Sequence, residues 1–200
     1  LAAGNEGVFD MHRQAPERIL QCYWLDTRLE DPLRHLEEAW DRMRFCMVKL
    51  HQCWTPFDPS GPLVHDVAAW CAGRNLPLFF HLYSARDVHA CFEVIRARPQ
   101  TSFILAHCID VRVAEEKPRV DNLFFDISPP DLVGTWQIRK AAGIVGADHV
   151  LLGSDTPYGR NNLRRNIARV RSLGLDAAFV DGILGNSLAA LLGIGVRHHG

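Results

Sequence analysis

The stretch HVLLGSDTPYG, from His149 to Gly159, decides how the fold of this chain is interpreted. Its apolar beginning fits a strand in a protein interior. It ends on Asp155, and the turn-forming residues Pro157 and Gly159 follow at once. A carboxylate at the end of a buried strand carries a desolvation penalty unless a cationic side chain, backbone N–H groups or a metal ion meets it. The partner of Asp155 must therefore lie where the fold brings other strand ends beside it.

Length and composition predict one domain. With 48% hydrophobic residues, the 200-residue chain can form one substantial core, and we expect a single domain over residues 1–195 and a tail at 196–200. The formal net charge of −1 provides no field for nucleic acid or an anionic membrane, and no apolar run approaches the roughly 20 residues of a membrane span. Six single cysteines without a C-x-x-C pair indicate free thiols, so we predict a cytoplasmic protein.

Five further apolar segments are of the same kind as the one at 149–155. They are continuous rather than alternating, which is typical of parallel strands buried on both faces. The predicted strands span residues 19–26, 45–51, 77–82, 102–108, 122–128 and 149–155. Segments with helical spacing lie between them, one of which opens with the N-cap candidate Asp31. This alternation predicts a parallel α/β fold, and an open doubly wound sheet and a (β/α)8 barrel both have it.

Ionisable residues occupy the carboxyl ends of these strands. They are Lys49, His51, His81, His107, Asp126 and Asp155. Because parallel strands place these ends on one side, the residues should converge on one rim, where active sites of such folds lie. A lone strand-end histidine is more often structural, but two histidines with an aspartate are typical ligands of zinc or manganese. Asp126 has a simpler alternative as the cap of a turn.

At these residues the sequence resembles the amidohydrolase superfamily, and more closely its amidohydrolase-2 branch of hydrolases and decarboxylases. The matching segments cover roughly the whole chain in the family's order: VKLH at 48–51, LPLFFHLYS at 76–84, FILAHC at 103–108, LFFDIS at 123–128, VLLGSDTPYG at 150–159 and ILGNSLAALLGI at 183–194. The resemblance implies a (β/α)8 barrel of the TIM type that holds one divalent metal ion, zinc first and manganese as the alternative. It places the metal ligands on His81 and Asp155, and catalytic roles on His107 and Asp155.

The H-x-H pair on the family's first strand has no counterpart before residue 81. If the strand of Asp155 is the family's eighth, the strand at 19–26 is its third, so the chain lacks about the first two strands. We therefore expect an N-terminally incomplete barrel domain, or one whose beginning lies upstream of Leu1. Six strands leave two edges unpaired, and a homo-oligomer is one way to cover them.

The resemblance implies a metal-dependent hydrolase or decarboxylase that acts on a small organic acid, ester or lactone. A metal lowers the pKa of its bound water to about 7, and Asp155 with His107 would serve in acid–base chemistry. In a decarboxylase, the metal and His107 would instead orient the substrate carboxylate. Candidate substrate contacts are Lys49, Trp54 and Arg160. The alternatives are a non-catalytic relative that serves binding or assembly and a metal-dependent nuclease, against which the neutral charge argues.

Overall fold

The computed structural model describes residues 1–195 and joins six strands in one parallel sheet, in the order β1-β2-β3-β4-β5-β6. The strands are β1 (Cys22–Trp24), β2 (Met47–His51), β3 (Leu78–His81), β4 (Phe103–Leu105), β5 (Leu123–Asp126) and β6 (Val150–Leu151). Each strand pairs with the next one along the chain and the order never reverses. This is the winding of a barrel and not of a doubly wound sheet. The prediction of a parallel α/β fold, in the form of a partial TIM-type barrel, is confirmed.

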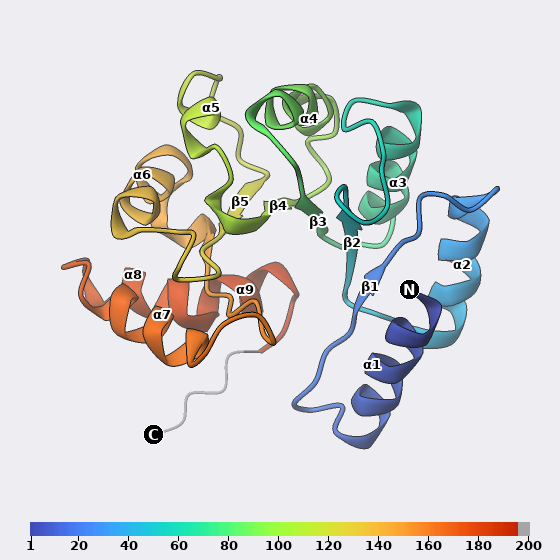
Figure 1. Cartoon of the computed structure of the whole chain (residues 1–200), viewed down its shortest axis with the longest axis horizontal. Coiled ribbons are helices and arrows are strands. Elements are labelled where there is room, and N and C mark those ends of the chain that lie inside the picture. Colours follow the sequence, from blue (N-terminus) through green and yellow to red (C-terminus); the bar gives the residue numbers. More distant parts are fainter. Residues whose placement is uncertain (196–200) are drawn as a thin grey trace.

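Helices form an arc outside the strands (Figure 1). An unpredicted helix, α1 (Ala2–Gln14), precedes the sheet. The crossover helices are α2 (Pro32–Met43), α3 (Pro62–Ala72), α4 (Ala85–Ala97), α5 (Val111–Glu115) and α6 (Thr135–Val145). After the last strand come α7 (Asn162–Arg171), α8 (Ala177–Asp181), the π-helical turn η3 (Gly182–Asn186) and α9 (Ser187–Leu191). Asp31 caps α2 as predicted, because its side chain accepts from the Arg34 N–H at 3.0 Å.

All six strands are shorter than the sequence suggests, and two of the differences move predicted site residues out of their strands. His107 lies in the 3₁₀ turn η1 (Ala106–Cys108) with φ 61°, and Asp155 has φ 55°. A left-handed backbone cannot continue a strand. The predicted strands at 102–108 and 149–155 therefore end before these residues, which lie in the turns that follow β4 and β6. The predicted tail at 196–200 lies outside the described residues.

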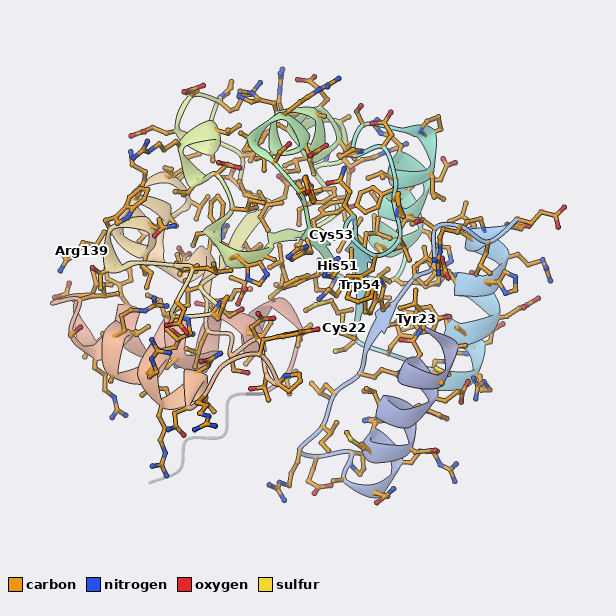
Figure 2. The ribbon with its side chains drawn as sticks, viewed as in Figure 1. Cys22, Tyr23, His51, Cys53, Trp54 and Arg139 are labelled. Atoms are coloured by element: carbon orange, nitrogen blue, oxygen red, sulfur yellow. The ribbon has the colours of Figure 1, made fainter. Side chains whose placement is uncertain are left out.

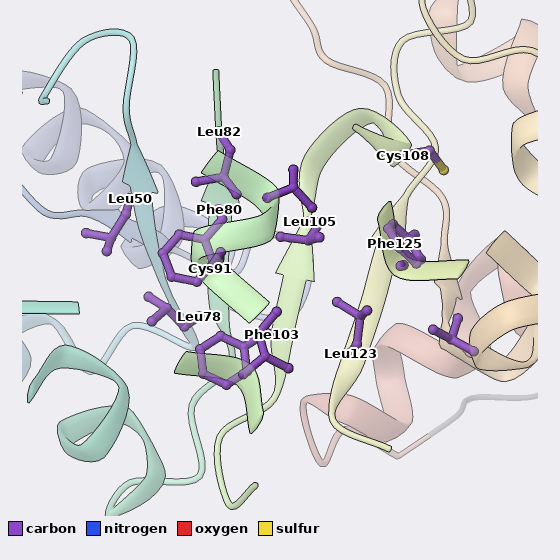
Figure 3. Close-up of a cluster of buried hydrophobic side chains, with 14 of the residues drawn as sticks. Leu50, Leu78, Phe80, Leu82, Cys91, Phe103, Leu105, Cys108, Leu123 and Phe125 are labelled. Carbon is purple, nitrogen blue, oxygen red and sulfur yellow. The ribbon is translucent and has the colours of Figure 1, made fainter. Parts of the chain in front are cut away.

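The main core lies between the sheet and the helices. It contains every second strand residue, including Leu50, Phe80, Phe103 and Phe125, all with 0% exposure (Figure 3). The rings of Phe80 and Phe103 stack with their centroids 5.9 Å apart. Because side chains alternate along a strand, the intervening residues point to the opposite, inner face of the sheet.

The inner face carries a smaller apolar cluster. It consists of Met47, Ile104, Phe124 and Leu151, against which residues from the last helix pack, namely Leu188, Leu191 and Leu192. Two residues further along the strands, the inward positions become ionisable, as in Lys49 after Met47 and Asp126 after Phe124. The polar site therefore lies at the carboxyl ends of the strands, as predicted.

Two further observations concern the described residues. All six cysteines are free thiols, in agreement with the sequence analysis. Within residues 1–195, none of the helices combines the length and the apolar character that crossing a bilayer requires.

Candidate metal and catalytic site

The carboxyl ends of the strands surround a cavity of about 750 Å³. Its lining includes five of the six predicted site residues, which are Lys49, Trp54, His81, His107 and Asp155, together with His51, Cys53, Trp24, Arg28, Tyr158 and Leu1. The sixth, Arg160, is exposed and is not part of the lining. The structure thus brings together residues from β1, β2, β3, the turn after β4 and the loop after β6.

Three imidazole rings meet in this cavity. His51 and His81 are register partners on β2 and β3, and their rings stack with centroids 3.9 Å apart. The ring of His107 meets that of His81 edge-on at 4.8 Å. Trp24 stacks on the other side of His51 at 5.1 Å. Figure 2 shows His51 beside Cys53 and Trp54 at the end of β2.

Both stacked imidazoles are held neutral. Desolvation, then the charge of Lys49, lowers the pKa of His51 to about 4. Desolvation, then the neighbouring His51 and His107, lowers the pKa of His81 to about 3. A neutral imidazole offers a lone pair, which is the form that binds a metal ion.

The tightest group of potential metal donors consists of His51, Cys53 and His81. One ligand atom from each residue lies within 4.8 Å of the other two, and Cys53 Sγ is 3.7 Å from His81 Nδ1. The Nδ1 atom of His51 is buried and has no hydrogen-bond partner among the described residues. Asp155 lines the same cavity but is not one of these three. The sequence analysis named His51 only as a strand end and missed Cys53, although the spacing H-x-C at 51–53 was visible.

His107 differs from the other two histidines because its ring is held by hydrogen bonds. Its Nδ1 lies 2.5 Å from the carbonyl oxygen of Ser128 and 3.7 Å from Asp126 Oδ2. A carbonyl only accepts, so Nδ1 carries the hydrogen and Nε2 is left with the lone pair. The Asp126 carboxylate also accepts from the His107 backbone N–H at 3.2 Å. These contacts fix both the tautomer and the orientation of the ring.

Asp126 has a larger role than the turn cap that the sequence suggested. It accepts from the Ser128 N–H at 3.3 Å, which is the expected turn, and also from Ser128 Oγ at 2.6 Å. Its exposed fraction is 5%. Burial raises the pKa of Asp126, and the hydrogen bonds from Ser128 and His107 oppose that rise. Asp126 is thus a positioning residue that acts through His107.

The same carboxylate explains why a glycine stands at position 153, in the stretch HVLLGSDTPYG. A Cβ atom on Gly153 would lie far inside contact distance of Asp126 Oδ1 and 2.9 Å from Ser128 Oγ. Two asparagines of α7 hold the segment that carries Asp155, because Asn162 Nδ2 donates to the Ser154 carbonyl at 2.9 Å and Asn166 Nδ2 to that of Gly153 at 2.6 Å. The sequence analysis missed both asparagines. They lie one turn apart on the buried face of α7, a position that favours apolar residues.

Lys49 provides the cation that is available to an acidic ligand. Its Nζ lies 5.7 Å from the ring centroid of Trp24 and 5.2 Å from that of Phe79, and no ion pair holds it within residues 1–195. The guanidinium of Arg28, by contrast, is paired with Asp26 at 2.7 Å. Trp54 and Tyr158 are 63% and 66% exposed, which is consistent with aromatic residues at the mouth of the cavity.

Comparisons with known proteins identify the family and support the fold. Residues 2–194 match the sequence profile of a family described as amidohydrolase. A search of curated protein sequences finds no match to the chain. Among solved structures, 2,6-dihydroxybenzoate decarboxylase from Rhizobium aligns with a TM-score of 0.77 and 16% identity, over 96% of this chain and 76% of that one.

Two further solved structures are similar to the same extent. A putative 2-pyrone-4,6-dicarboxylic acid hydrolase from Pseudomonas putida aligns with a TM-score of 0.76 and 13% identity, over 96% of this chain and 78% of that one. A dihydroxybenzoic acid decarboxylase from Polaromonas, solved with bound manganese and 2-nitroresorcinol, gives a TM-score of 0.76 and 14% identity, over 96% and 74%. At these identities the likeness establishes the fold.

Proposed function

The chain belongs to the amidohydrolase family, and from this premise we propose that it is a metal-dependent enzyme that decarboxylates small organic acids, aromatic acids above all. The observation that carries the proposal is the content of one cavity. It joins the neutral imidazole of His81 and the carboxylate of Asp155 to the cation of Lys49 and the ring of Trp54. A carboxylate ligand with a flat apolar body fits such a lining.

The donor atoms fit a divalent ion. His81 and Asp155 would hold it. The buried Nδ1 of His51, which has no hydrogen-bond partner among the residues that the structure describes, is a polar atom that a cation would satisfy. When bound, the ion polarises an oxygen of the substrate or lowers the pKa of a water. Lys49 would bind the substrate carboxylate, and the aromatic side chains would exclude water from the ring.

His107 is suited to deliver the proton that decarboxylation needs. The ring carbon that bears the carboxylate takes up one proton, its bond to the carboxyl carbon breaks, and CO₂ leaves. The Nδ1–H of His107 is already committed to the Ser128 carbonyl, so Nε2 is the atom that gains and releases this proton. The buried side chain of Asp126, whose Oδ2 lies 3.7 Å from Nδ1, helps to hold the ring in place during this transfer.

Hydrolysis of an ester or lactone is the second candidate, and one observation favours it. The Asp155 carboxylate lines the cavity together with His107, which places two groups able to accept a proton from an attacking water. The putative hydrolase from Pseudomonas putida shares the fold. The two reactions differ in product, since decarboxylation releases CO₂ and hydrolysis releases only acid.

The test combines metal content with a substrate panel. The purified chain, supplied with zinc or manganese, is assayed for CO₂ release from hydroxybenzoates and for acid release from lactones. We expect near-stoichiometric metal, lost in Asp155→Asn, and CO₂ release abolished in His107→Asn with the metal retained. Lys49→Met should raise KM about 10- to 100-fold, because a charge-assisted hydrogen bond contributes about 1.5–3 kcal/mol. A folded chain that takes up no metal and turns over no acid would contradict the proposal and favour the non-catalytic alternative.

A further inference from the structure

We propose that His51 and Cys53 complete, with His81, a three-donor site that contains a thiolate and selects zinc over manganese. The inference rests on the proposed function, because it concerns the ion that the same cavity would hold. It goes beyond that function because it assigns two further ligands and the identity of the metal. His81 alone is shared with the ligand pair described above.

The distances suit zinc. The three ligand atoms lie within 4.8 Å of one another, and Cys53 Sγ is 3.7 Å from His81 Nδ1. In a tetrahedral site with Zn–N of about 2.0–2.1 Å and Zn–S of about 2.3 Å, a nitrogen and a sulfur ligand are about 3.6 Å apart. The pair in this chain already has that separation.

The backbone that presents these donors is fixed. His51 ends β2, directly opposite His81 on β3. The Gln52 N–H donates to the His81 carbonyl at 2.9 Å, which ties the next residue to the same strand. The His51 carbonyl then accepts from the Thr55 N–H at 2.9 Å, closing a turn around Cys53. A rigid turn that follows a strand is the kind of support that a metal ligand needs.

One donor is left unsatisfied by the protein, and a second is accessible to a ligand. The buried Nδ1 of His51 has no hydrogen-bond partner in the described part of the chain, and an unsatisfied buried nitrogen is costly. Cys53 is the exposed cysteine of the chain, whereas the other five are buried or half-buried. Burial raises the pKa of each of those five thiols and keeps them protonated. In Cys22 the pKa is raised to about 12. Cys53 is therefore the cysteine whose sulfur is most accessible to a metal ion.

The donor set indicates which metal binds. Thiolate and imidazole ligands favour zinc, whereas carboxylate and water suit manganese. Three protein ligands leave a fourth position, which is typical of catalytic zinc sites. Asp155, which lines the same cavity, or a substrate oxygen can occupy it. The relative from Polaromonas was solved with manganese, so the inference predicts a difference between the two chains.

Cobalt titration tests the inference directly. After the chain is stripped of metal with a chelator, Co²⁺ is added and the near-ultraviolet thiolate-to-cobalt charge-transfer absorption is recorded. We expect this absorption to saturate at one equivalent in the wild type, to disappear in Cys53→Ser and to persist in the matched variant Cys46→Ser. Zinc affinity should fall more than about 100-fold in Cys53→Ser, since even outer-shell partners are worth 10- to 100-fold. His51→Gln should weaken zinc binding while the sulfur absorption remains.

The outcomes separate this inference from the proposed function. Because Cys53 is exposed, its replacement leaves the core untouched, and circular dichroism checks the fold of each variant. A cobalt complex without the charge-transfer absorption, or wild-type zinc affinity in Cys53→Ser, overturns the inference. If metal is bound in those cases but lost in Asp155→Asn, the proposed function stands with a different ligand set. A preference for manganese over zinc would also overturn the selectivity.

Discussion

The two sides of the rim hold their histidines in opposite ways. On the side of β4 and β5, His107 is fixed by the Ser128 carbonyl and lies beside a buried carboxylate, Asp126. On the side of β2 and β3, His51 and His81 stack on each other, and the buried nitrogen of His51 has no partner within residues 1–195. The ring of His107 is therefore fixed by oxygen atoms of the protein, whereas His81 Nδ1 contacts Cys53 Sγ at 3.7 Å and His51 Nδ1 is left without a partner among residues 1–195.

This difference separates two kinds of chemistry. A ring with a fixed tautomer and a nearby carboxylate can gain and lose a proton without changing its position. Desolvated, neutral rings offer lone pairs that can bind a metal ion. Under the proposed function, the rim thus divides into a proton-handling side and a metal-binding side. Changes on one side should leave the other intact.

Gly153→Ala should disrupt the contacts that hold His107, and it should lower the stability more than any other variant considered. The added methyl group would overlap Asp126 Oδ1 and crowd Ser128 Oγ, both of which support His107. Overpacking of this kind typically costs about 1–3 kcal/mol, and here the crowded atoms are buried and hydrogen-bonded. We expect a lower urea midpoint and loss of CO₂ release, whereas the cobalt–thiolate absorption remains.

The matched control is Gly143→Ala in α6, where a Cβ meets nothing within 4 Å. This change should leave the stability unchanged or raise it by up to about 1 kcal/mol, because alanine favours a helix. If Gly153→Ala is as stable as Gly143→Ala, the close approach of Asp126 is not the reason that position 153 is a glycine.

The sequence predicted the fold well, because the pattern that matters is long-range repetition. Six continuous apolar segments alternate with helical ones, and this pattern indicates parallel strands even where their ends are misplaced. The winding direction could not be derived from the residues themselves, since the barrel and the doubly wound sheet have the same rhythm. The resemblance of segments such as VLLGSDTPYG supplied it, and the strand order confirms it. The misplaced ends, at His107 and Asp155, reflect backbone angles that the side-chain pattern does not encode.

The lining of the cavity was predictable for residues at or just beyond the carboxyl ends of the strands. Lys49 and His81 lie within strands, whereas His107 and Asp155 lie in the turns that follow. Cys53 lies two residues beyond its strand, and its closeness to His81 depends on a turn whose hydrogen bonds are not visible in the sequence. The role of Asn166 depends on the distance of a helix from a loop. Such contacts are tertiary, so composition and spacing do not reveal them.

The pH dependence of stability should distinguish the metal-binding side. His51 and His81 have pKa values of about 4 and 3 in the folded chain, against 6.5 as their ordinary value. Below pH 6.5 the unfolded chain binds protons that the folded chain excludes, so the free energy of unfolding falls as the pH falls from 6.5 toward 4. For the metal-free chain, we expect the urea midpoint to be lower at pH 5 than at pH 7, by less than the effect of Gly153→Ala.

Replacement of both histidines should reduce this slope. The double variant His51→Gln/His81→Gln removes the two groups, and His89→Gln, an exposed position on α4, serves as the control with an unchanged slope. Between pH 7 and 5 the carboxylates with lowered pKa values stay ionised, so they contribute little to the change of the unfolding free energy with pH. An equal slope in the double variant would show that other groups govern the pH dependence.

Arg160→Ala should have the smallest effect of these variants. It serves as a comparison with Lys49→Met, because Arg160 lies outside the cavity lining. The side chain is exposed and does not line the cavity, unlike Lys49 between Trp24 and Phe79. A charge that does not contact the substrate is screened by solvent and salt, so kcat/KM should change less than about twofold. Lys49→Met, assayed in parallel on the same acid, should lower kcat/KM at least about tenfold. Equal losses in the two variants would place the substrate carboxylate over the loop after β6, and the aromatic mouth of the cavity would then be its entrance rather than its binding surface.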